Sequence, residues 1–111
     1  MEKEDREVYS AIREARTAGR PCALATVVST RGSTPRKNGA KMLVEPERGL
    51  VGTVGGGCGE ANVIQVAKEV IESGIPRMVQ VDLTDDPMEW TGSICGGVLN
   101  VFVEPVLPPT P

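Results

Sequence analysis

The stretch TVGGGCGEANV, residues 53–63, joins an apolar run to a helical pattern through a cluster of glycines around one cysteine. Glycine loses more conformational freedom on folding than any other residue, so such a cluster indicates that the backbone closely approaches a ligand or another element of the fold. A strand, a glycine turn and a helix N-terminus together can hold an anion, because the first N–H groups of a helix have no partner within it. Cys58 would lie at this terminus, where the thiolate is favoured.

The known phosphate-binding fingerprints do not match this stretch. A G-x-G-x-x-G pattern begun at Gly55 meets Glu60 where its last glycine should be, and a P-loop begun at Gly52 would need lysine in place of Cys58. An alternative to ligand binding is close packing of the helix against the sheet at a point where only glycine fits.

The patterns on either side predict the remaining elements. Apolar runs around EPERG predict a hairpin over 40–54, with Gly49 at a positive φ. An amphipathic helix is expected to end before Gly19, and a second one to end at Gly74. Strands are expected over 22–29, 77–83 and 98–106. This order predicts the α/β class (mixed α+β): a single small domain, with a mixed β-sheet of about five to six strands and two main helices packed on it.

Composition excludes several classes of function. The 111 residues carry a net charge of −3 and no histidine, and no basic block favours nucleic-acid binding. No apolar run is long enough to span a membrane, and the charged N-terminus does not resemble a signal peptide. Three cysteines without a C-x-x-C pair give no support to a metal site, and they predict a cytoplasmic protein with reduced thiols. The domain is expected to span 1–106, with 107–111 as a proline-rich tail or linker stub.

Two further segments carry candidate chemistry. The loop over 30–39 concentrates hydroxyl and guanidinium groups that suit phosphate or carboxylate recognition, although a solvated surface loop is the better explanation when this loop is taken alone. In SICGGV, residues 93–98, Cys95 is flanked by glycines and is sterically open, which suits either a nucleophile or a purely structural thiol. Cys22 lies within an apolar strand and is expected to be a small buried hydrophobe.

Four stretches occur in one order within residues 23–105: ALATVVSTRGSTPRKNGAKMLV, GLVGTVGGGCGEANVI, VDLTDD and ICGGVLNVFVEP. In these stretches the chain resembles the N-terminal domain of the XdhC/CoxI family, and the resemblance covers nearly all of the chain after the first helix. The paired G-G-G-C and C-G-G motifs are its most specific features.

The resemblance implies a maturation factor for a molybdenum hydroxylase, of xanthine dehydrogenase or carbon monoxide dehydrogenase type. Such a factor binds molybdenum cofactor (molybdopterin) transiently, assists its sulfuration with a cysteine desulfurase, and inserts it into the apo-enzyme. Cys58 and Cys95 match the motif cysteines and are the candidate catalytic residues. The expected cofactor-binding residues are Arg31, Gly32, Ser33, Arg36, Gly55, Gly56, Gly57, Cys58, Gly59, Glu60, Cys95, Gly96 and Gly97.

Family members typically continue into a Rossmann-type domain, so a separate chain of that type is an expected partner, and so is a second copy of this chain. An accessory factor is favoured over a turnover enzyme. Two alternatives remain open: a persulfide-carrying sulfur-relay or thiol-redox protein, in which Cys58 or Cys95 carries the sulfur, and a non-catalytic interaction module.

Overall fold

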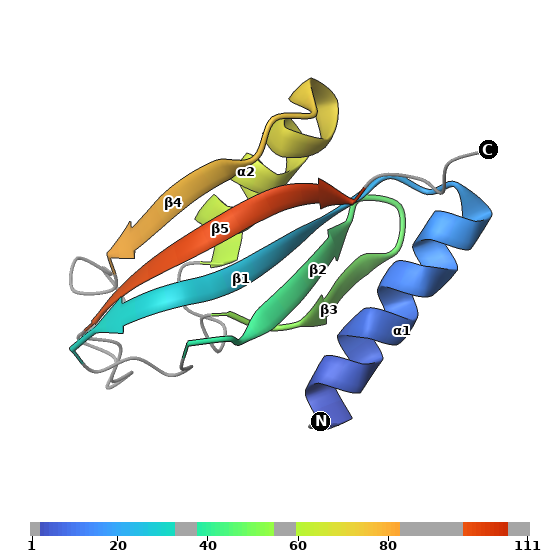
Figure 1. Cartoon of the computed structure of the whole chain (residues 1–111). Coiled ribbons are helices and arrows are strands. Elements are labelled where there is room, and N and C mark those ends of the chain that lie inside the picture. The colour runs from blue at the N-terminus through green and yellow to red at the C-terminus, as the bar shows by residue number, and fades with distance from the viewer. Residues whose placement is uncertain (1–2, 33–37, 55–59, 83–96, 107–111) are drawn as a thin grey trace.

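The computed structural model describes residues 3–32, 38–54, 60–82 and 97–106. Two helices lie on opposite faces of one five-stranded sheet (Figure 1). The strand order is β3-β2-β1-β5-β4, and each neighbouring pair is antiparallel. The elements are α1 (Lys3–Ala18), β1 (Cys22–Arg31), β2 (Lys41–Glu45), β3 (Gly49–Gly52), α2 (Glu60–Ser73), β4 (Arg77–Asp82) and β5 (Val98–Val106).

The predicted class, the two helices and the approximate number of strands are confirmed. We expected a mixed sheet, whereas every strand pair in the described part of the chain is antiparallel. The reason is the path of α2, which connects β3 at one edge of the sheet to β4 at the other edge. A helix that joins two neighbouring strands would make them parallel, but this helix crosses the whole face of the sheet.

Two aliphatic clusters hold the layers together. Successive side chains of a strand point to opposite faces, so Ala23 and Ala25 of β1 pack with α2 while Cys22 and Leu24 pack with α1. The α2 side is the larger cluster and includes Met42 and several valines. Each fully buried large aliphatic side chain contributes roughly 1.5–3 kcal/mol, which makes these clusters the main source of stability.

Glycines end both helices as their positions in the sequence predict. Gly19 has φ 73°, and its N–H donates to Arg16 O at 3.2 Å while the N–H of Arg20 donates to Ala15 O at 2.9 Å. This pair of bonds is a Schellman motif. Gly74 has φ 74°, and its N–H donates to Val70 O at 2.8 Å. Neither α1 nor α2, the two helices in the described residues, is long and apolar enough to cross a membrane.

Candidate functional site

Four of the candidate site residues lie within the described part of the chain: Arg31, Gly32, Glu60 and Gly97. Arg31 and Gly32 are exposed at the end of β1, Glu60 is half-buried at the start of α2, and Gly97 is buried directly before β5. The remaining candidates lie outside the described residues: Ser33, Arg36, Gly55, Gly56, Gly57, Cys58, Gly59, Cys95 and Gly96. The site is therefore built from the residues that border these segments.

The residues bordering segments 33–37 and 83–96 are neighbours in the sheet. Arg31, close before the first segment, pairs with Val98 of β5. Val98 also pairs with Asp82, the last residue of β4. Both segments therefore start from one end of the sheet, and 83–96 returns to it (Figure 1).

A bulge in β1 separates this end from β2. The register with β5 shifts between Val27 and Ser29, and beyond it β1 pairs with β5 alone. Asn100 Nδ2 donates to Ser29 Oγ at 2.8 Å directly after the shift. Bulges bend a strand and change the direction of its side chains, so this bulge alters the course of β1 before its last residue, Arg31.

The borders of the glycine segment 55–59 lie on the same side of the sheet, but set back from the end formed by Arg31, Val98 and Asp82. β3 finishes at Gly52, which pairs with Met42 near the start of β2. Thr53 Oγ1 donates a hydrogen bond to Glu60 Oε2 across the segment. Because Met42 in turn pairs with Ala25 of β1, the end of β3 is level with a position six residues before Arg31.

The electrostatics of this end favour an anion. The N-terminus of α2, a helix of 14 residues, presents the positive end of its dipole here. The exposed Arg31 guanidinium adds a cation that can bind phosphate or carboxylate in a bidentate manner. Lys41 does not add to this charge, because its side chain lies on the α1 face of the sheet, where Nζ is 5.9 Å from the centre of the Tyr9 ring and donates to Gly39 O at 2.9 Å. Glu60 is the opposing charge at the helix terminus.

The opposite end of the sheet carries a different cluster. Arg20 Nε donates to Glu45 Oε1, and the side chains of the two residues are 18% and 6% exposed. Arg20 also reaches Glu14 at 3.3 Å. These contacts raise the pKa of Arg20 above its ordinary value, chiefly through the hydrogen bond to Glu45.

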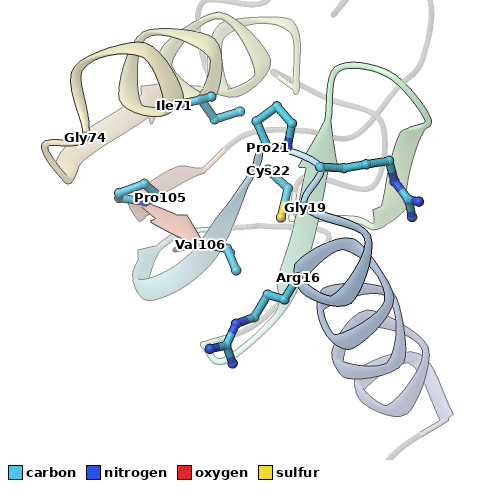
Figure 2. A pocket seen from close by; sticks show the side chains of 9 residues that line it. Arg16, Gly19, Pro21, Cys22, Ile71, Gly74, Pro105 and Val106 are labelled. Atoms are coloured by element: carbon cyan, nitrogen blue, oxygen red, sulfur yellow. The ribbon is translucent and has the colours of Figure 1, made fainter. Parts of the chain in front are cut away.

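A pocket of about 250 Å³ lies at this second end, and it contains none of the candidate site residues (Figure 2). Both helices end beside it, at Gly19 and Gly74. Helix C-termini carry the negative end of the dipole, which disfavours an anion there. The lining residues are Arg16, Gly19, Arg20, Pro21, Cys22, Ile71, Gly74, Pro105 and Val106.

Cys22 is confirmed as a buried residue, with 2% of its surface exposed. Burial raises the pKa of its thiol, the charge of Glu45 raises it further, and Arg20 opposes this shift. A thiol with a raised pKa is a poor nucleophile at neutral pH. Cys22 is therefore a packing residue, as its place in an apolar strand predicts.

Two of the residues described above were not among the sequence candidates. Thr53 carries a hydrogen bond across the glycine segment, but in the sequence it is simply the polar residue after a strand. Glu45 is 5% exposed, although it precedes a turn where an acidic residue would be expected in solvent. Their partners are 7 and 25 residues away, so no local pattern identifies them.

The fold and the site define a class: a small antiparallel α/β domain in which the segment after Arg31 and the segment that holds Cys95 border one end of the sheet. Within that class, a model of the family described as "XdhC and CoxI family" matches residues 15–82. The chain belongs to the XdhC/CoxI family.

Three relatives illustrate the match. The chain is 39% identical over 83 residues to the uncharacterized protein YqeB of Escherichia coli, covering 75% of this chain and 15% of the relative. It is 32% identical over 83 residues to a probable xanthine dehydrogenase subunit of Bacillus subtilis, covering 73% of this chain and 25% of that protein. A crystal structure described as a xanthine dehydrogenase from Bacillus halodurans superposes with a TM-score of 0.72 at 31% identity, covering 88% of this chain and 30% of that one. The chain thus spans less than a third of the length of each.

Proposed function

We propose that this chain serves the maturation of a molybdenum hydroxylase of xanthine dehydrogenase or carbon monoxide dehydrogenase type. In this proposal it binds molybdenum cofactor transiently, assists its sulfuration together with a cysteine desulfurase, and passes it to the apo-enzyme. The observation that supports the proposal is the shared border of two motif segments: Arg31 pairs with Val98, and Val98 pairs with Asp82. The arginine-bearing segment 33–37 and the segment that holds Cys95 therefore border the same end of the sheet.

The residues at this end suit the chemistry of the cofactor. Its phosphate is anionic, and the N-terminus of α2 with the Arg31 guanidinium favours an anion. Its molybdenum and dithiolene are soft centres, for which thiolates such as those of Cys58 and Cys95 are fitting neighbours. The chain would hold the cofactor through backbone N–H groups of the glycine segments and through the two arginines, Arg31 and Arg36, with the thiols beside its reactive end.

The partners in this proposal follow from the resemblance to the family. The chain spans less than a third of the length of each of the three relatives. We include a Rossmann-type chain of the same family and a second copy of this chain as partners. Cytoplasmic location is part of the proposal, because the reactive thiols need a reducing compartment.

A binding experiment tests the proposal directly. The purified chain is incubated without oxygen with molybdenum cofactor freed from a molybdenum enzyme, then desalted, and its molybdenum content is measured. We expect wild type to retain cofactor, and both Cys58→Ala and Cys95→Ala to weaken retention several-fold. Cys22→Ala is the matched control, since Cys22 is buried at the other end of the sheet and its loss should leave retention unchanged. Wild-type retention in both of the first two variants would remove the thiols from the site.

A further inference from the structure

One half of the α1 face of the sheet carries no helix. α1 packs against β2 and β3, and its C-terminal part reaches Cys22 at the start of β1 and Val106 at the end of β5. In the described part of the chain the other helix, α2, lies on the opposite face (Figure 1). The α1 face of residues 26–31, 98–102 and 78–82 is therefore uncovered, and we call it the open face.

The side chains of the open face form three rows across the strands. Leu99 and Val101 of β5 and Val79 and Val81 of β4 belong to the cluster under α2, so the residues that alternate with them point to the α1 face. Residues directly opposite each other in neighbouring strands share a face. The rows, each in the order β1, β5 and β4, are Thr26, Phe102 and Met78; Ser29, Asn100 and Gln80; and Arg31, Val98 and Asp82.

The charges of the third row have opposite signs on the two sides of β5. Arg31 lies on β1 and Asp82 on β4, with Val98 between them, and both charged residues are exposed. A two-fold axis that runs along β5 above the open face exchanges the β1 side with the β4 side. A second copy placed by this axis would set its Asp82 over Arg31 of the first copy, and its Arg31 over Asp82.

The other rows are compatible with the same axis. Phe102 lies on the central strand, so it would meet Phe102 of the second copy, and aromatic rings pack well against each other. Met78 is 59% exposed, and the packing would bury it against β1 of the second copy. Exposed apolar side chains of this size on a sheet face favour coverage by another layer.

The shape of the domain permits two sheets to stack in this way. Stacked sheets lie about 10 Å apart with their strands roughly aligned. β4 is an edge strand, so in the second copy it would lie over β1 with no further strand beside it. Helix α1, which covers β2 and β3, would then stand beside this edge and would not obstruct it.

We propose that the open face is the interface between two copies of this chain, related by a two-fold axis along β5. In a two-fold dimer the same surface patch must complement itself, and the placement of Arg31 and Asp82 meets this condition, which an unrelated partner would not require. The face is only three strands wide, so we expect a weak dimer that depends on protein concentration. Because Arg31 contacts Asp82 of the second copy, its binding to a cofactor phosphate would belong to the single chain.

Exchange of the two charges tests the interface by sedimentation equilibrium. We expect Arg31→Glu and Asp82→Arg each to raise the dissociation constant by about tenfold or more, because each places like charges over each other twice in the dimer. The double variant Arg31→Glu/Asp82→Arg should associate as wild type does. A mixture of the two single variants should form a heterodimer, since both contacts then join opposite charges. A contact between the two residues within one chain would not give this result.

The apolar row is tested by Met78→Lys. The side chain is largely exposed, so the fold should accept lysine, whereas the dimer would bury its charge. We expect the dissociation constant to rise by about tenfold. Leu50→Lys is the matched control, since Leu50 is 43% exposed on β3 at the other edge of the sheet and should leave association unchanged. Circular dichroism confirms that each variant is folded.

Three results would overturn the proposal: a wild type that stays monomeric at every concentration, interface variants that associate as wild type does, or a mixture of the single variants that associates no better than each alone. If wild type stays monomeric but binds a Rossmann-type chain of the family, and Met78→Lys prevents this, the open face receives that chain and not a second copy. None of these measurements uses the cofactor, so the cofactor-retention experiment decides the proposed function separately.

Discussion

The two ends of the sheet use their charges in opposite ways. At one end Arg20 and Glu45 are largely buried and bound to each other, beside a protonated thiol and the C-termini of both helices. At the other end Arg31 is exposed, the N-terminus of α2 presents its positive pole, and glycine-rich segments begin and end. Charged side chains that bind each other, such as Arg20 and Glu45, stabilise the fold. Charged side chains that face solvent, such as Arg31, are available to bind a ligand. The first end is held by its own charges, and the second end is the one to which we assign the proposed binding of the cofactor.

The largest effect we expect comes from the end of β3. Gly52→Ala should lower the free energy of unfolding by about 3 kcal/mol, because it adds a backbone clash to a φ of 81°. Gly49→Ala, at the other end of the same strand, is the matched control, since φ is 102° there but nothing lies within 4 Å of the added Cβ. It should lose about 1 kcal/mol, from backbone strain alone. Urea unfolding measures both.

If both variants lose the same free energy of unfolding, the backbone of β3 moves at Gly52 to accommodate the added Cβ. The close approach to Lys41 and Val8 would then relax at little cost, and the glycine segment would start from a movable strand. The end of β3 would then no longer count as a fixed point from which the glycine segment starts.

Local features of the fold could be predicted from the sequence, and long-range pairing could not. Gly19, Gly49 and Gly74 were expected to end or turn elements, because each decision depends on a few neighbouring residues, and all three have positive φ. The strand directions were not obtained, because nothing in the sequence of α2 states that it crosses from β3 to β4 over the whole sheet.

The same distinction applies to the candidate site. The motifs contain residue types that suit an anion, but the sequence does not show that the segments after Arg31 and before Val98 border one end of the sheet, because this depends on a pairing between residues far apart in the chain. The Thr53–Glu60 bond depends on how tightly the helix returns to the strand. Charged pairs are difficult for a related reason: Arg20 contacts Glu14, six residues away, but its buried bond is to Glu45, at a separation of 25 residues.

The next effect compares one ion pair with another. Glu45→Gln should lower the melting temperature by roughly 5 °C, because the charge-assisted bond to Arg20 is shielded from water. Glu69→Gln is the matched control: Glu69 pairs with Arg77, but both side chains are about half exposed, at 49% and 50%. Exposed pairs are worth little and are screened by salt, so this variant should melt within about 1 °C of wild type.

The melting temperatures of both variants and of wild type are measured at low and at high salt. The Glu45→Gln deficit should persist at high salt, whereas any deficit of Glu69→Gln should vanish. If the two variants melt at the same temperature, the Arg20–Glu45 pair is no better shielded from water than a surface ion pair, and it does not stabilise its end of the sheet.

The smallest effect concerns the thiol at that end, and its sign follows from the raised pKa of Cys22. Burial is the main cause of this shift, and the negative charge of Glu45 adds to it. Above about pH 8.5 the thiol of the unfolded chain loses its proton, while the folded protein keeps it. The folded state then binds more protons than the unfolded state, so stability falls as pH rises. Below that pH the thiol is neutral in both states and the contribution is fully present.

Urea unfolding of wild type and Cys22→Ala from pH 7 to pH 10 isolates this contribution. Other groups titrate in both proteins, so the difference between the two curves belongs to Cys22. We expect wild type to lose stability more steeply above about pH 8.5, by at most about 1.4 kcal/mol per pH unit, and the curves to run parallel below it. Curves that stay parallel to pH 10 would show that the folded thiol ionises as readily as the unfolded one. Water would then reach the sulfur through the adjoining pocket, and Cys22 would have to be considered beside Cys58 and Cys95 as a reactive thiol.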